Sequence, residues 1–151
     1  MKKLLLFLLP VVLTMFACKD ARPQSDIDEE KIKDYLKANH INAQRDDYSR
    51  IYYVIQDPGS GNNPNTNSYV KIKYKGYLLD GTVFDQTDGD ETYESPLRGF
   101  ISGWQIAVPL LKPGGKGTFY IPSGLAYGRY GNGSIPPNEV LAFDIELISF
   151  R

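Results

Sequence analysis

The sequence has 151 residues, with 17 Lys and Arg against 18 Asp and Glu and a formal net charge of −1. Proteins that bind nucleic acid concentrate positive charge to meet the phosphate backbone, so this near balance argues against nucleic acid as a partner. Cys18 is the one cysteine, which excludes an intramolecular disulfide. The length suits a single domain after a short leader.

Residues 1–17 have the pattern of a signal peptide rather than of a folded element. Two lysines follow the first Met, and residues 4–16 form an apolar run that ends before Ala17. This run is too short to span a bilayer as a helix. A buried core helix is the alternative, and Pro10 in the middle of the run argues against it.

Cys18 directly follows the apolar run, and this arrangement resembles the bacterial lipobox, in which the cysteine becomes the lipidated N-terminus. Met15 stands where lipoboxes usually carry Leu. The resemblance implies a protein of the cell envelope, lipid-anchored to a bacterial membrane and facing the periplasm or the cell surface. Plain cleavage or a free thiol are the alternatives. Residues 18–25 would then comprise the lipidated cysteine and a polar tether.

Residues 26–39 are expected to form a helix, which is the main part of an N-terminal helical extension over residues 26–48. Acidic side chains crowd the first turn of this helix, where the helix dipole favours anions. Ile32 and Leu36 lie at helical spacing on one stripe. We expect the helix either to pack on the main domain or to serve as a spacer. His40, the one histidine, is expected at the surface and not as a metal ligand.

Residues 49–151 are expected to form the main domain, in which apolar strands alternate with turn sequences. Residues 50–56 are rich in β-branched and aromatic side chains, which favour a strand, whereas residues 57–68 have turn chemistry. Over residues 69–79, apolar side chains alternate with lysines, a pattern typical of a half-buried antiparallel strand. This alternation places Tyr74 on the inner face.

The rest of the chain is organised around Trp104, the one tryptophan. Residues 102–108 are expected to form one short helix that Pro109 ends, and residues 122–137 a long Gly- and Pro-rich loop. Several antiparallel strands with one short helix predict the α+β fold class. Further strands are expected at residues 82–85, 115–121 and 139–150, and a short extended piece at residues 93–97.

Other kinds of site receive little support. Asp88, Asp90 and Glu91 do not have the spacing of a calcium-binding EF-hand, so no metal is expected. Ser123 lies far along the chain from His40, and a Ser-His-Asp arrangement for nucleophilic catalysis is therefore disfavoured. No cofactor is expected.

The main domain resembles the FKBP-type peptidyl-prolyl isomerases through three strings that keep the family's order: VKIKYKGYLLDGTVFDQT, FISGWQIAVPLLKPGGKGTFYIPSGLAYG and SIPPNEVLAFDIELISF. The match runs continuously from Val70 to Phe150, and residues 50–56 fit the family's first strand. The resemblance implies an FKBP-like fold, a twisted antiparallel β-sheet wrapped around one short helix. The loop between Gly131 and Ile135 is shorter than the family pattern, which affects the rim of the family's pocket.

The resemblance also implies the functional residues. Aromatic rings would enclose the substrate's proline, the Ile101 N–H and the Tyr127 hydroxyl would bind substrate carbonyls, and Asp85 would orient groups at the pocket mouth. The residues implied to be catalytic are Tyr74, Phe84, Asp85, Ile101, Trp104, Tyr127 and Phe143, and those implied to bind substrate are Tyr93, Phe100 and Ile135.

The family resemblance implies a peptidyl-prolyl cis-trans isomerase that acts on exported proteins from a membrane tether. Its partners would be proline-containing polypeptides and macrolide ligands of the rapamycin type. A chaperone module that captures proline segments with little turnover is the alternative. A Tyr-rich carbohydrate-binding lipoprotein is a third hypothesis, because aromatic faces also stack on sugars.

Overall fold

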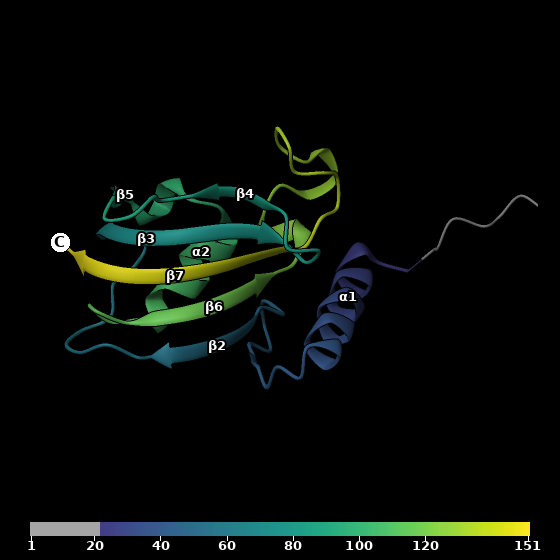
Figure 1. The fold of residues 1–151 in the computed structure, drawn as a ribbon, viewed down its shortest axis with the longest axis horizontal. Coiled ribbons are helices and arrows are strands. Elements are labelled where there is room, and N and C mark those ends of the chain that lie inside the picture. Colours follow the sequence, from purple (N-terminus) through teal and green to yellow (C-terminus); the bar gives the residue numbers. More distant parts are fainter. Residues whose placement is uncertain (1–21) are drawn as a thin grey trace, which may run out of the picture.

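The computed structural model describes residues 22–151 (Figure 1). The predicted signal peptide and the predicted lipidation site at Cys18 lie outside the described residues. Within the described residues, no helix has the length and apolar character that crossing a membrane requires.

One antiparallel sheet organises the described part of the chain. Its strand order is β1-β2-β6-β7-β3-β4, and the short strand β5 also pairs with β3. The predicted α+β class, a sheet wrapped around one short helix, is confirmed. The strands are β1 (Gln44–Arg45), β2 (Tyr52–Asp57), β3 (Tyr69–Leu78), β4 (Val83–Gln86), β5 (Tyr93–Pro96), β6 (Lys116–Ile121) and β7 (Leu141–Phe150).

The helix α2 (Ser102–Ala107) lies against one face of this sheet, as Figure 1 shows. The main core fills the space between them, with Phe119, Ile72 and Leu147 fully buried. Short 3₁₀ turns occupy Leu97–Gly99, Val108–Leu110, Ser123–Leu125 and Gly128–Tyr130, the last two within the predicted Gly- and Pro-rich loop.

The helix α1 (Gln24–Ala38) begins two residues earlier than predicted, so the end of the predicted tether is helical. Of the two alternatives for this helix, packing on the main domain is the one observed. Ile32 and Leu36 are buried in a second apolar cluster with Tyr52 and Tyr120 of the sheet. Figure 1 shows α1 at the end of the sheet where β6 finishes and β7 begins.

This docking explains why β6 is more buried than its alternation predicts. Phe119 and Ile121 point to the main core, as expected. Tyr120 points to the other face, yet it is only 3% exposed, because α1 covers it. Its ring centroid lies 5.7 Å from that of Tyr35. Burial raises the pKa of Tyr120 to about 12.

Glu29 anchors the polar side of α1. Its carboxylate lies 2.9 Å from the Lys33 ammonium and 3.0 Å from the Arg45 guanidinium, and it accepts a 3.0 Å hydrogen bond from the Tyr52 hydroxyl. The Lys33 contact, with those of Arg45 and Tyr52, outweighs partial desolvation and lowers the pKa of Glu29 to about 2. Glu29 therefore belongs to an ion network within α1 and between α1 and the strands β1 and β2, beyond the helix-dipole role expected from the sequence.

We expect Glu29→Gln to make folding stability less sensitive to acid. A carboxyl with a lowered folded-state pKa contributes stability above its ordinary pKa and loses it as the pH falls. The wild type should therefore exceed the variant in stability at neutral pH, and the difference should disappear between pH 4.5 and about 2. Urea unfolding across this range measures the effect. A constant difference across the same range would contradict the assigned pKa.

Candidate active site

A hollow of about 260 Å³ opens between α2 and the strands that face it. Nine of the ten residues predicted for the site line it, and they come from four strands, from α2 with the segment just before it, and from the loop between β6 and β7. The lining residues are Tyr74, Phe84, Asp85, Tyr93, Phe100, Ile101, Trp104, Tyr127 and Phe143. The structure therefore brings together residues that are as much as 69 positions apart in the chain.

Trp104 is the floor of this hollow. The indole is only 3% exposed, and its ring centroid lies 4.7 Å from that of Phe100 in a stacked arrangement. Tyr74 and Phe143 meet it edge-on at 5.2 Å and 5.3 Å. Offset and edge-to-face contacts of this kind fix ring orientation, so the floor is rigid before any ligand binds.

Gly103 allows α2 to approach the sheet closely enough to hold Trp104 there. A Cβ atom at this position would lie 2.4 Å from Cγ2 of Ile121 on β6. Ile101 occupies the N-cap position of α2 in an extended conformation, and its carbonyl accepts a 3.0 Å hydrogen bond from the Trp104 N–H. The turn that opens α2 therefore places Ile101 and Trp104 on the hollow together.

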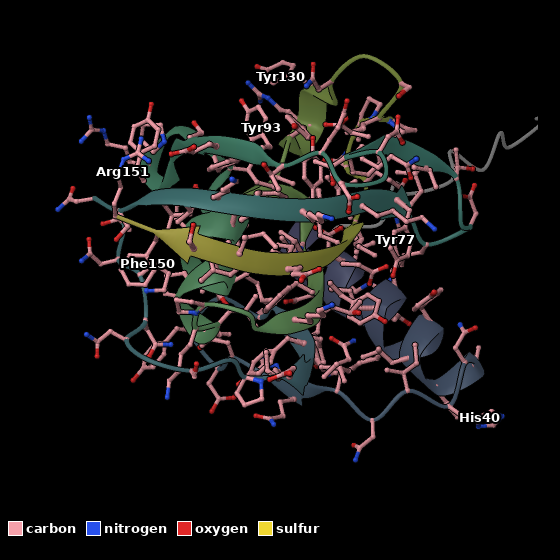
Figure 2. All side chains as sticks on the ribbon, turned by 60° about the vertical axis from the view of Figure 1, so that its left-hand side comes forward. His40, Tyr77, Tyr93, Tyr130, Phe150 and Arg151 are labelled. Carbon is pink, nitrogen blue, oxygen red and sulfur yellow. The ribbon has the colours of Figure 1, made fainter. Side chains whose placement is uncertain are left out.

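The walls combine rings from β3, β4, β5 and β7. Phe84 meets Phe143 edge-on at 5.6 Å, and Tyr93 meets Phe100 edge-on at 5.8 Å. Tyr93 is 49% exposed and stands at the rim. Figure 2 places Tyr93 and Tyr130 on the same side of the molecule, opposite His40.

Tyr74 and Asp85 form the polar side of the hollow. The Tyr74 hydroxyl donates a 2.5 Å hydrogen bond to the Asp85 carboxylate. Burial first, and then this contact, raise the pKa of Tyr74 above its ordinary value, so the phenol stays a donor. Asp85 is exposed at the mouth of the hollow, and its hydrogen bond holds the Tyr74 side chain in place.

Ile135 is the predicted site residue that the structure does not place on the hollow. It is 6% exposed and packs in the main core, and Asn132 pairs with it in a tight bridge. Asn132 and Ile135 exchange backbone hydrogen bonds of 3.0 Å and 2.8 Å, so the loop between Gly131 and Ile135 folds back on itself.

Gly76 is a site determinant that composition and alternation did not single out. It lies on β3 between Asp85 of β4 and Phe143 of β7. A Cβ atom here would lie 2.6 Å from the Phe84 ring and 2.8 Å from the Phe143 ring. Both rings therefore occupy space that only glycine leaves open.

A second hollow, of about 490 Å³, lies on the outer face of the sheet. Most of its charged side chains are paired, and the Lys75 ammonium lies over the Tyr77 ring, 5.6 Å from its centroid. Lys116 lies 3.3 Å from Glu146, and Lys73 lies 3.1 Å from Asp90. Thr118 donates to Asp144 at 2.7 Å. These pairs leave it without the convergent, unpaired polar groups that mark a ligand site.

The sequence comparisons decide the family. The family model of the FKBP-type peptidyl-prolyl cis-trans isomerases matches residues 61–148. The chain belongs to this family. Strands β3 to β6, the helix α2, most of β7 and the whole aromatic hollow lie within the matched segment.

Individual family members agree with this assignment. The FKBP-type isomerase FkpA of Aeromonas hydrophila is 40% identical over 125 residues, which cover 82% of this chain and 47% of that protein. The isomerase Mip of Coxiella burnetii is 40% identical over 103 residues, covering 67% of this chain and 45% of that protein. The chain thus spans about half the length of the curated relatives it matches.

Solved structures of the family have the same fold. The crystal structure of FkpA from Escherichia coli superposes with a TM-score of 0.74 at 33% identity, covering 84% of this chain and 61% of that one. A peptidyl-prolyl cis-trans isomerase from Pseudomonas syringae gives a TM-score of 0.70 at 30% identity, covering 88% of this chain and 98% of that one. The FKBP-like fold with a preceding helix is therefore confirmed.

Gly76→Ala is expected to displace the aromatic rings that line the hollow. The added methyl group must displace the Phe84 or Phe143 ring, and overpacking of this kind costs about 1–3 kcal/mol. Urea unfolding followed by Trp104 fluorescence should show this loss. Gly99→Ala is the matched control, because the nearest atom to its added Cβ would be Ser95 Oγ, at 3.8 Å. Equal behaviour of the two variants would show that the rings do not depend on Gly76.

Proposed function

We propose that this protein is a peptidyl-prolyl cis-trans isomerase whose active site is the aromatic hollow on Trp104. The observation that carries the proposal is the convergence of nine predicted residues on one hollow, within the segment that matches the family model. Its substrates are proline-containing polypeptides, and macrolides of the rapamycin type would compete for the same hollow.

The reaction needs no nucleophile. Amide resonance gives the X-Pro bond a rotational barrier of about 18–20 kcal/mol, and the planar bond is charge-separated, with a partly negative oxygen and a partly positive nitrogen. Water stabilises this separation, whereas the twisted transition state carries less of it. Transfer into an apolar cup therefore disfavours the planar ground state more than the transition state, which is differential binding.

The residues around the hollow have distinct roles in this mechanism. The rings of Trp104, Phe84 and Phe143 enclose the proline and exclude water. The Ile101 N–H and the Tyr127 hydroxyl hold substrate carbonyls and set the orientation of the bond. Asp85 keeps the Tyr74 ring in place at the mouth, and no proton transfer is assigned to it.

Phe84→Ala should lower kcat/KM for a proline-containing tetrapeptide by about tenfold or more, equivalent to about 1.4 kcal/mol of transition-state stabilisation. The reason is that water enters where the ring closed the hollow. Cis-to-trans relaxation of the peptide, with and without rapamycin, measures the effect on the purified protein. Val83→Ala is the matched control, since Val83 is the adjacent strand residue, is 42% exposed and is absent from the lining.

Asp85→Asn should also lower kcat/KM by about tenfold, because an amide holds the Tyr74 hydroxyl less firmly than a carboxylate does. Asp88→Asn, an exposed change in the following loop, should have no effect. Rapamycin binding without acceleration by the wild type would favour the low-turnover chaperone module. If the wild type neither binds nor accelerates, the assignment of the hollow as an active site is wrong.

We further propose that lipid at Cys18 tethers the protein to a bacterial membrane, where it acts on exported proteins. The proposal rests on the two lysines, the apolar run and the small residue that precede Cys18. Metabolic labelling with palmitate in a bacterial host should mark the wild type and the Met15→Leu variant, whose sequence is closer to the lipobox. Cys18→Ser should abolish labelling. Labelling that persists in Cys18→Ser, or an unlabelled wild type, would refute the anchor.

A further inference from the structure

A buried carboxylate links α1 to the loop that carries Tyr127. Asp28 is 1% exposed, and its Oδ2 accepts hydrogen bonds from the Ser123 backbone N–H at 2.8 Å and from the Ser123 hydroxyl at 2.6 Å. Its Oδ1 accepts a 2.7 Å hydrogen bond from the Gln24 amide. Both carboxylate oxygens are therefore satisfied, as a buried charge requires.

The contact secures the 3₁₀ turn Ser123–Leu125 from outside the loop. Ser123 is its first residue, where a backbone N–H lacks a partner within the turn, and Asp28 supplies the acceptor. Two short hydrogen bonds continue toward the hollow, from Leu125 N–H to Pro122 O at 2.9 Å and from Ala126 N–H to Ser123 O at 3.0 Å. Tyr127 is the next residue after Ala126. Because these hydrogen bonds hold the turn together, a displacement of Ser123 would also displace Tyr127.

A second contact from α1 secures the other side of Tyr127. The Lys31 ammonium, one turn after Asp28, donates to the Asn138 carbonyl at 3.4 Å. The Asn138 N–H in turn donates to the carbonyl of Gly128 at 2.8 Å. Gly128 is the residue after Tyr127, so α1 is connected to the loop both before and after this side chain.

We propose that α1 is a positioning element of the active site and that Asp28, acting through Ser123, is the residue that orients Tyr127. This inference rests on the proposed isomerase function and extends it to the N-terminal helix. Asp28 touches no substrate. A purely apolar α1 would dock through Ile32 and Leu36 alone, whereas the charge-assisted bonds of Asp28 fix the docking at one point of the loop.

A double-mutant cycle tests the proposal in the purified protein. Asp28→Ala should weaken rapamycin binding, followed by Trp104 fluorescence, and raise KM for a proline tetrapeptide, each by about threefold to tenfold, the value of one hydrogen bond from Tyr127. Tyr127→Phe alone should have the same effect. Asp28→Ala in the Tyr127→Phe background should add nothing, because both changes remove one interaction. Additive losses would overturn the proposal.

A matched control separates positioning from stability. Leu36→Ala removes apolar packing of the same helix two turns away and should lower stability while leaving KM and rapamycin affinity unchanged. Asp28→Asn retains an acceptor oxygen and should restore part of the affinity. A rise in KM for Leu36→Ala equal to that for Asp28→Ala would reduce the role of Asp28 to general docking and contradict the proposal.

Hydrogen exchange tests the link independently of activity. Amides of residues 123–131 should exchange faster in Asp28→Ala than in the wild type or in Leu36→Ala, because the anchor of the loop is lost. Unchanged exchange in this segment would refute the inference even where the protein is an active isomerase. Faster exchange in a protein that neither binds rapamycin nor accelerates isomerisation would refute the proposed function and leave the link itself supported.

Discussion

The contact of Trp104 with the facing strands is the interaction on which the rest of the structure depends. The indole is held between Phe100 on its own segment and the rings of Tyr74 and Phe143 on the sheet. It can lie there only because Gly103 lets α2 approach Ile121 closely. The same packing that completes the core therefore also forms the floor of the hollow.

This origin explains the chemistry that the hollow offers. Core packing supplies aromatic rings as floor and walls, and polar groups also line the hollow, among them the hydrogen-bonded pair of Tyr74 and Asp85. Such a site cannot activate a nucleophile, but it can separate an amide from water and hold it in one orientation. A reaction whose barrier lies in torsion rather than in bond breaking is the one that gains most from it.

Local sequence patterns predicted most of the fold, and the family resemblance predicted nearly all of the lining residues. The alternation in β3 and the short helix around Trp104 depend on neighbouring residues, and the family motifs kept the wall residues in order. Contacts between segments far apart in the chain could not be predicted from such patterns. The link between Asp28 and Ser123 spans 95 positions, and the burial of Tyr120 depends on where α1 docks. For Ile135 the motif matched, but the side chain packs in the main core and is not among the lining residues of the hollow.

The solvent isotope effect on catalysis tests the central claim most directly. If the hollow acts by taking the X-Pro bond out of water, with no proton moved, kcat/KM for a proline tetrapeptide should be the same in H₂O and in D₂O within error. A ratio of about two or more, of the kind expected when a positioned side chain transfers a proton in the rate-limiting step, would contradict this account.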